Sequence, residues 1–158
     1  MERFSIREVI EQAVQTERLG HQFYSAMAQR FKDNERMSAF FTDLAHKEVV
    51  HEKTFADLRD LVGDSEPDGW EEVSQYMRAM VESKFFIGSN KALTSMETTT
   101  DIGEVIRFAI GFEKESLLYY YGIREAVKEK EIIDEIINEE KSHIRWLAAF
   151  RDSFMKKA

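Results

Sequence analysis

The chain has 158 residues, which is enough for one domain with a sizeable core. Its formal net charge is −8 and it has no cluster of lysine and arginine, so we do not expect nucleic acid as a partner. It contains no cysteine, which excludes disulfides, thiol chemistry, zinc ribbons and cysteine-bound iron within these residues.

The first residues, "MERFSIREVIEQ", carry charge from residue 2 onward and lack the apolar segment of a signal peptide. Nowhere does the chain approach the roughly 18 consecutive apolar residues that a membrane-spanning helix needs. We therefore expect a cytoplasmic protein with no membrane partner, organised as a single domain over residues 1–158. One proline and seven glycines leave few helix breakers, so long helices are predicted.

Two long helices are predicted in the first part of the chain. Ser5 and Glu8 form a capping-box signature at the start of the first helix, and "KDNE" at 32–35 ends it. Residues spaced alternately three and four apart share one face of a helix. The first such stripe consists of Ile6, Ile10, Ala13, Glu17, Gly20, Tyr24, Met27 and Phe31. The second stripe, which Gly63 closes as the C′ residue, consists of Met37, Phe41, Leu44, Glu48, His51, Phe55, Leu58 and Val62.

A third helix is predicted over residues 70–88, after a loop with the sequence "GDSEPDG". A polar segment then leads to Asp101 and Glu104, which form a second capping signature. The face of the third helix that we expect to be buried holds Trp70, Val73, Met77, Met80 or Val81, and Lys84 or Phe85.

Two more long helices are predicted on either side of a charged turn, "KEKE" at 128–131. Their stripes are Ile102, Ile106, Ala109, Glu113, Ser116, Tyr120, Ile123 and Val127, and then Ile133, Ile136, Glu140, His143, Leu147, Phe150 and Phe154. Two long helix pairs, joined by a connection of about 40 residues that carries its own helix, predict an all-α fold. This is a four-helix bundle with one long crossover, the connectivity of ferritin-like proteins.

Both helix pairs carry the same polar residues on the face that they should bury. In each pair the first helix contributes one Glu and the second contributes a Glu-x-x-His, "EVVH" or "EKSH", whose Glu and His share one face. The midpoint between the two Glu residues falls at the predicted turn in the first pair and beside the predicted turn in the second. All of these side chains are therefore expected at a common level of the bundle: Glu17, Glu48, His51, Glu113, Glu140 and His143.

Four carboxylates and two imidazoles in one core layer need positive charge, because an unpaired buried carboxylate costs several kcal/mol. A buried layer of salt bridges is the alternative, but no Lys or Arg lies on the stripes at this level. Two divalent metal ions balance the four negative charges. Carboxylate and imidazole ligands suit iron or manganese, with zinc as a further alternative, and the pattern matches the di-metal site of ferritin-like proteins.

Three further residues are candidates for contacts with the metal ligands. Tyr24 and Tyr120 each follow a stripe Glu by seven residues, two turns along the same face, so each hydroxyl can reach a ligand carboxylate. Packing in the core is the alternative for both tyrosines. His21 lies at the edge of its stripe, and is either a partly buried polar residue or a residue that supports or replaces a ligand.

From "EQAVQTERLGHQFY" to "EEKSHIRWL" the sequence resembles the rubrerythrin-like branch of the ferritin-like superfamily. The resemblance implies that the first Glu of each half is a terminal or mobile ligand, that the Glu of each Glu-x-x-His bridges the metals, and that each His binds one metal. The sequence departs from typical rubrerythrins at Ser116, where they carry an additional Glu, and it lacks the four cysteines of a rubredoxin domain.

The function expected from this resemblance is that of a di-iron oxidoreductase with two Fe ions per site, which reduces hydrogen peroxide or dioxygen. Its electrons would come from a separate electron-donor protein, since the chain has no cysteine-bound iron. Alternatives are a ferroxidase that handles iron, manganese catalase chemistry, and a non-enzymatic metal-binding module. We expect a homodimer or a higher homo-oligomer.

Overall fold

The computed structural model describes residues 5–64, 66–81, 96 and 99–155. The last seven residues of the helix predicted over residues 70–88 lie outside this part of the chain. The described residues contain no strand. Their helices are α1 (Ile6–Arg30), α2 (Glu35–Val62), α3 (Trp70–Val81), α5 (Ile102–Ala126) and α6 (Lys130–Met155).

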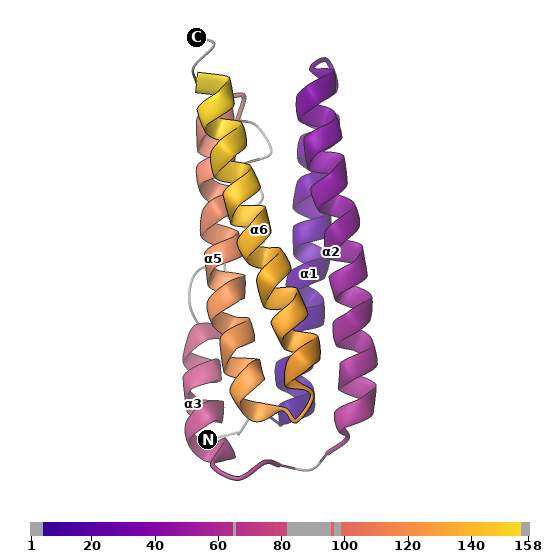
Figure 1. Cartoon of the computed structure of the whole chain (residues 1–158), viewed down its shortest axis with the longest axis vertical. Coiled ribbons are helices and arrows are strands. Elements are labelled where there is room, and N and C mark those ends of the chain that lie inside the picture. The colour runs from indigo at the N-terminus through magenta and orange to yellow at the C-terminus, as the bar shows by residue number, and fades with distance from the viewer. Residues whose placement is uncertain (1–4, 65, 82–95, 97–98, 156–158) are drawn as a thin grey trace.

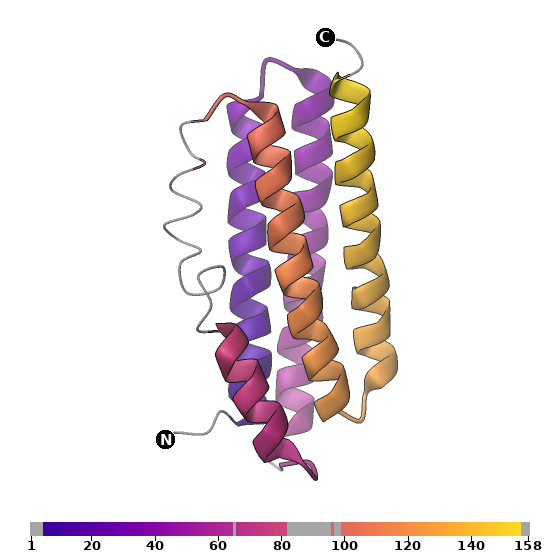
Figure 2. The ribbon, with the colours of Figure 1, turned by 90° about the vertical axis from the view of Figure 1, so that its left-hand side faces the viewer.

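The four long helices form two antiparallel hairpins, α1–α2 and α5–α6, that lie side by side (Figure 1). In the view of Figure 1, α1 and α6 run upward while α2 and α5 run downward, so the chain between α2 and α5 has to return along the length of the bundle. Helix α3 packs against the lower part of α5 (Figure 2). The prediction of an all-α, ferritin-like four-helix bundle with a long crossover is confirmed.

Local signals place the ends of the first hairpin where the sequence predicts them. The Ser5 hydroxyl accepts a hydrogen bond of 3.1 Å from the Glu8 backbone N–H, and the Glu8 carboxylate accepts one from the Ser5 N–H, which completes the capping box. The Asn34 side chain caps the start of α2 by accepting a hydrogen bond of 3.1 Å from the Met37 backbone N–H. Helix α2 ends at Gly63, whose φ of 63° is favourable only for glycine.

The second predicted capping signature is only half realised. Asp101 caps α5 by accepting a 2.9 Å hydrogen bond from the Gly103 backbone N–H. The Glu104 carboxylate does not return to the cap residue but accepts a hydrogen bond of 3.0 Å from the Thr99 hydroxyl. The side chain of Glu104 therefore ties the preceding segment to the first turn of α5.

The predicted stripes are the buried faces of the helices, with one clear exception at the end of α6. Phe154 is 37 % exposed, so its predicted burial is wrong. Arg36, in the first turn of α2, donates a hydrogen bond to the Ser153 hydroxyl. Position 153 is therefore already level with the start of α2, and Phe154 lies at the end of the bundle.

Helix α3 is held by the side chains that its pattern predicts. Trp70 and Met77 are buried, and Val73 packs against the same apolar cluster. Met77 approaches α5 at Gly122, where a Cβ atom would lie only 2.1 Å from its sulfur. The absence of a side chain at Gly122 therefore allows α3 to dock closely.

The apolar core is divided into two clusters by a polar layer at mid-height. One cluster lies on the α3 side and the other towards the α1–α2 turn, and the buried Glu and His residues lie between them in all four helices. The first cluster includes Ile10, Ala13, Phe55, Leu58, Ile123 and Ile136, and the second includes Tyr24, Phe41, Leu44, Ile106, Ala109 and Leu147.

Each described helix is either too short or too polar to cross a membrane.

Candidate metal centre

The six candidate ligands come together in the polar layer from four different helices. Each is at most 2 % exposed. Within each of two groups, every residue offers a ligand atom, and these atoms all lie within 4.8 Å of one another. The first group is Glu17, Glu48, His51 and Glu140, and the second is Glu48, Glu113, Glu140 and His143. Two carboxylates thus belong to both groups, and they are the two that the family resemblance assigns as bridges.

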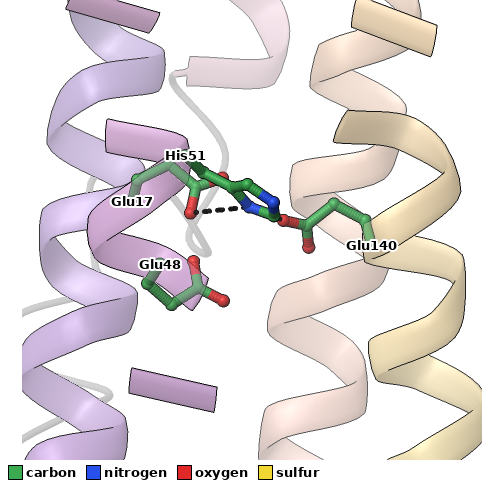
Figure 3. A group of neighbouring side chains, drawn as sticks. All are labelled: Glu17, Glu48, His51 and Glu140. Carbon is green, nitrogen blue, oxygen red and sulfur yellow. Dashed lines mark hydrogen bonds and ion pairs between the residues drawn. The ribbon is translucent and has the colours of Figure 1, made fainter. Parts of the chain in front are cut away.

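His51 connects the two hairpins at this level. Its Nδ1 lies 3.0 Å from Glu140 Oε1 and 3.6 Å from Glu17 Oε2. Figure 3 shows the imidazole of His51 between the carboxylates of Glu17 and Glu140, with the Glu48 carboxylate alongside. Side chains from α1, α2 and α6 therefore point at the same space.

His143 has the equivalent place in the second group. Its Nδ1 lies 3.4 Å from Glu113 Oε1 and 3.6 Å from Glu48 Oε1, so it faces one carboxylate of its own hairpin and one of the other. The rings of His143 and His51 lie nearly parallel, at an angle of 19°, with their centres 5.7 Å apart.

Both tyrosines donate hydrogen bonds to carboxylates of the cluster, and each does so across the bundle. The Tyr24 hydroxyl of α1 lies 2.6 Å from Glu113 Oε1 of α5, and the Tyr120 hydroxyl of α5 lies 2.5 Å from Glu17 Oε1 of α1. Burial and the surrounding carboxylates raise the pKa of both phenols well above 10. Both hydroxyls therefore stay protonated and hold their carboxylates in place.

His21 is not a member of either group. Its Nδ1 lies 3.2 Å from the Ala45 carbonyl oxygen, and its side chain is partly buried. Of the two roles that its position suggests, the structure favours the partly buried polar residue that joins α1 to α2.

Two residues at the site are not identified by the sequence pattern. The Glu139 carboxylate lies 2.5 Å from Nε2 of His51, on the side of the ring that points away from the cluster. Gly20 lies beside Glu48, where a Cβ atom would be 2.9 Å from a carboxylate oxygen. Glu139 lies off the stripe and is half exposed, so the sequence pattern indicates only a solvated residue. Gly20 carries no side chain that could indicate a role.

Comparison with models of protein families shows to which family the chain belongs. The model of the rubrerythrin family matches residues 8–151. The chain belongs to the rubrerythrin family. The resemblance inferred from the residues is thus confirmed over nearly the whole chain.

The fold of this rubrerythrin-family protein is also found in a solved structure from Thermotoga maritima. That protein, provisionally described as a ferritin-like diiron-carboxylate protein, superposes with a TM-score of 0.68 over 96 % of this chain and 97 % of its own. The two sequences are 21 % identical, so the likeness concerns the fold. A search of curated proteins finds no significant match.

The carboxylates of the site divide into two kinds by their pKa. Burial and repulsion from the neighbouring carboxylates raise the pKa of Glu48 and Glu140 well above the ordinary value of 4.5. Burial also opposes ionisation of Glu17 and Glu113, but hydrogen bonds from neighbouring carboxyls, histidines and tyrosines outweigh it and lower their pKa, that of Glu113 to about 2. In the metal-free protein the two shared carboxyls therefore hold protons most strongly.

The surroundings of His51 shift its pKa. Burial favours the neutral ring, but hydrogen bonds and negative charge from Glu17 and Glu139 outweigh it and raise the pKa to about 9. Without another cation at the site, His51 is therefore charged at neutral pH. A bound metal ion would replace this proton as the positive charge between the carboxylates.

The donor atoms fit a pair of divalent cations. One oxygen of each of the four carboxylates and both ring nitrogens of His143 are buried and have no hydrogen-bond partner among the described residues. Buried atoms of this kind cost free energy unless something satisfies them. No lysine or arginine is buried anywhere in the described ranges, so neither of these side chains satisfies the orphaned atoms. The two overlapping ligand sets contain four carboxylates in total. Their four negative charges would balance the positive charge of two divalent ions.

Proposed function

We propose that this protein is a di-iron oxidoreductase that reduces hydrogen peroxide or dioxygen. The observation that carries the proposal is the pair of overlapping buried groups that share Glu48 and Glu140. Iron is the proposed metal because oxygen and imidazole ligands suit it and because the chain belongs to the rubrerythrin family. Manganese shares these ligand preferences and is the alternative metal.

In this proposal Glu48 and Glu140 would supply ligand atoms to both metal positions. Glu17 and His51 complete the first position, while Glu113 and His143 complete the second. Two ferrous ions held together supply two electrons, which is the number needed to reduce one molecule of hydrogen peroxide, with two protons, to two molecules of water.

The protein contributes position, a fixed ligand geometry and exclusion of water. Tyr24 and Tyr120 hold one oxygen of each terminal carboxylate from the opposite hairpin, so these ligands cannot swing freely. The apolar clusters above and below the layer limit the access of bulk water. Since the chain contains no cysteine, we propose that a separate donor protein returns the electrons.

The test is to load the metal-free protein with Fe(II) in the absence of oxygen, count the iron, and add either hydrogen peroxide or O₂ in a stopped-flow instrument. We expect two iron atoms per chain and faster oxidation by hydrogen peroxide than by O₂. The double variant Glu48→Gln, Glu140→Gln is the matched control and should bind little iron.

Other outcomes would favour the other functions. A clear preference for O₂ with mineral formation would show a ferroxidase. Two bound metals without turnover of either oxidant would show a metal-binding module without enzymatic activity. Iron bound outside the cluster, or not at all, would refute the di-metal centre itself.

A further inference from the structure

The two halves of the centre differ in the residue that precedes the Glu of each Glu-x-x-His. In α6 this residue is Glu139, and in α2 the corresponding residue is Lys47. The two halves otherwise provide the same ligand types at the same level. The difference therefore places a negative charge behind one histidine and a positive charge near the other.

On one side, Glu139 holds the outer nitrogen of His51. Its carboxylate oxygen lies 2.5 Å from Nε2, while Nδ1 faces the cluster at 3.0 Å from Glu140. A carboxylate that accepts the Nε2–H fixes the orientation of the ring and directs the lone pair of Nδ1 inward. Such a partner also makes the imidazole a stronger ligand.

On the other side, Nε2 of His143 has no hydrogen-bond partner within the described ranges. The ring of Trp146 lies 5.6 Å from the ring of His143, and the ammonium group of Lys47 lies over this Trp ring at 5.6 Å from its centre. The ring of Trp146 and, beyond it, the ammonium group of Lys47 therefore lie near His143, whose Nε2 has no carboxylate partner among the described residues.

We propose that the two metal positions are unequal in affinity and fill in order. The group of Glu17, Glu48, His51 and Glu140 binds the first ion more tightly, with Glu139 as the positioning residue for His51. The group that contains His143 binds the second ion more weakly, and that ion is the one that exchanges. This inference rests on the metal centre of the proposed function but not on its redox chemistry.

The direction of the effect follows from two contributions that add. Loss of a carboxylate partner behind a metal-bound histidine typically lowers metal affinity about 10- to 100-fold. The positive charge of Lys47 acts against a cation at the other position, although Lys47 is partly exposed and solvent partly screens its charge. We therefore expect the first ion to bind about 10- to 100-fold more tightly than the second.

The test uses the full-length metal-free protein and Co(II), which has visible absorption bands and anomalous X-ray scattering. Crystals grown with one equivalent of Co(II) should show most of the anomalous density beside His51, and calorimetry should resolve a tight and a weak step. Glu139→Gln should lower the affinity of the tight step about 10- to 100-fold and spread one equivalent of Co(II) over both positions. Lys47→Glu should strengthen the weak step.

Glu135→Gln, an exposed change on the same helix, is the control and should alter neither step. Thermal melts of the metal-free variants detect any general loss of stability. A loss of stability alone would not shift Co(II) from one position to the other. Equal occupancy in the parent protein, or an unchanged distribution in Glu139→Gln, would overturn the inference while leaving a di-metal centre intact. A protein that binds no Co(II) at either position would refute this inference and the metal centre together.

Discussion

Replacing both shared carboxylates by amides tests whether the polar layer exists for metal rather than for the fold. Glu48→Gln with Glu140→Gln keeps the shape of both side chains and removes two negative charges from the layer. We expect this double variant to lose most of its metal affinity. In the absence of metal it should be at least as stable as the parent protein at neutral pH, because it no longer has to bury these two carboxyls.

The size of the effect follows from the pKa shifts. Keeping a carboxyl with an ordinary pKa of 4.5 protonated at pH 7 costs about 3 kcal/mol. This cost is the upper limit of the destabilisation that Glu48 or Glu140 can cause at pH 7, since the pKa of each is raised well above 4.5. The limit for both groups is therefore about 6–7 kcal/mol. The Gln amides are themselves buried with incomplete hydrogen bonding, which costs about 1–3 kcal/mol each. We expect a net gain in metal-free stability of about 1–3 kcal/mol at pH 7.

The pH dependence has a definite sign. Since the pKa of Glu48 and Glu140 is raised in the folded protein, their contribution to stability is fully present below the unfolded pKa near 4.5 and is lost as the pH rises through the folded values. The Gln variant does not titrate at these positions. Near pH 4.5 the variant should therefore be less stable than the parent protein, by the cost of its buried amides, and the balance should turn in favour of the variant towards neutral pH.

Thermal melts of parent and variant between pH 4.5 and pH 8, with and without Fe(II), measure this directly. Fe(II) should raise the melting temperature of the parent protein and leave that of the variant nearly unchanged. Glu131→Gln with Glu135→Gln, two exposed changes on α6, provides the control for loss of charge alone. A metal-free variant that melts far below the parent protein at pH 7 would refute the reasoning, since the carboxylates would then be needed by the fold itself.

Three smaller changes test two supports of the site and the docking of α3 on α5. Gly20→Ala improves helix propensity by about 1 kcal/mol but places a Cβ atom 2.9 Å from a Glu48 oxygen. Calorimetry with Co(II) should therefore show at least about tenfold weaker binding, without loss of metal-free stability. Tyr24→Phe removes the 2.6 Å hydrogen bond to a terminal carboxylate and should lower metal-free stability by about 1.5–3 kcal/mol in denaturant melts, whereas no change would show that this bond is not formed. Gly122→Ala forces a methyl group against the sulfur of Met77 and should cost about 1–3 kcal/mol, and a further Met77→Ala change should relieve the clash.

Regular features within each helix could be predicted from the sequence because helical periodicity and capping depend on residues only a few positions apart. The stripes, the Ser5 capping box, the stop at Gly63 and the shared level of the Glu and Glu-x-x-His residues are of this kind. The two hairpins each repeat the same residues around a turn, which is why the heights of the ligands could be matched before any fold was known. The end of the bundle interrupts this regularity, and there the prediction for Phe154 is wrong.

What the tertiary structure alone decides is which side chains meet across helices. Each tyrosine follows a Glu on its own helix, yet its hydroxyl donates to the Glu of the opposite hairpin. The reason is that α1 and α5 pack against each other at this level, which brings the carboxylate of one helix next to the tyrosine of the other. The contact of Glu139 with His51 and the space that Gly20 leaves for Glu48 depend on distances between helices, on which local periodicity carries no information. The opposite pKa shifts of chemically identical carboxyls have the same origin, since burial and the neighbouring charges are set only when four helices enclose them.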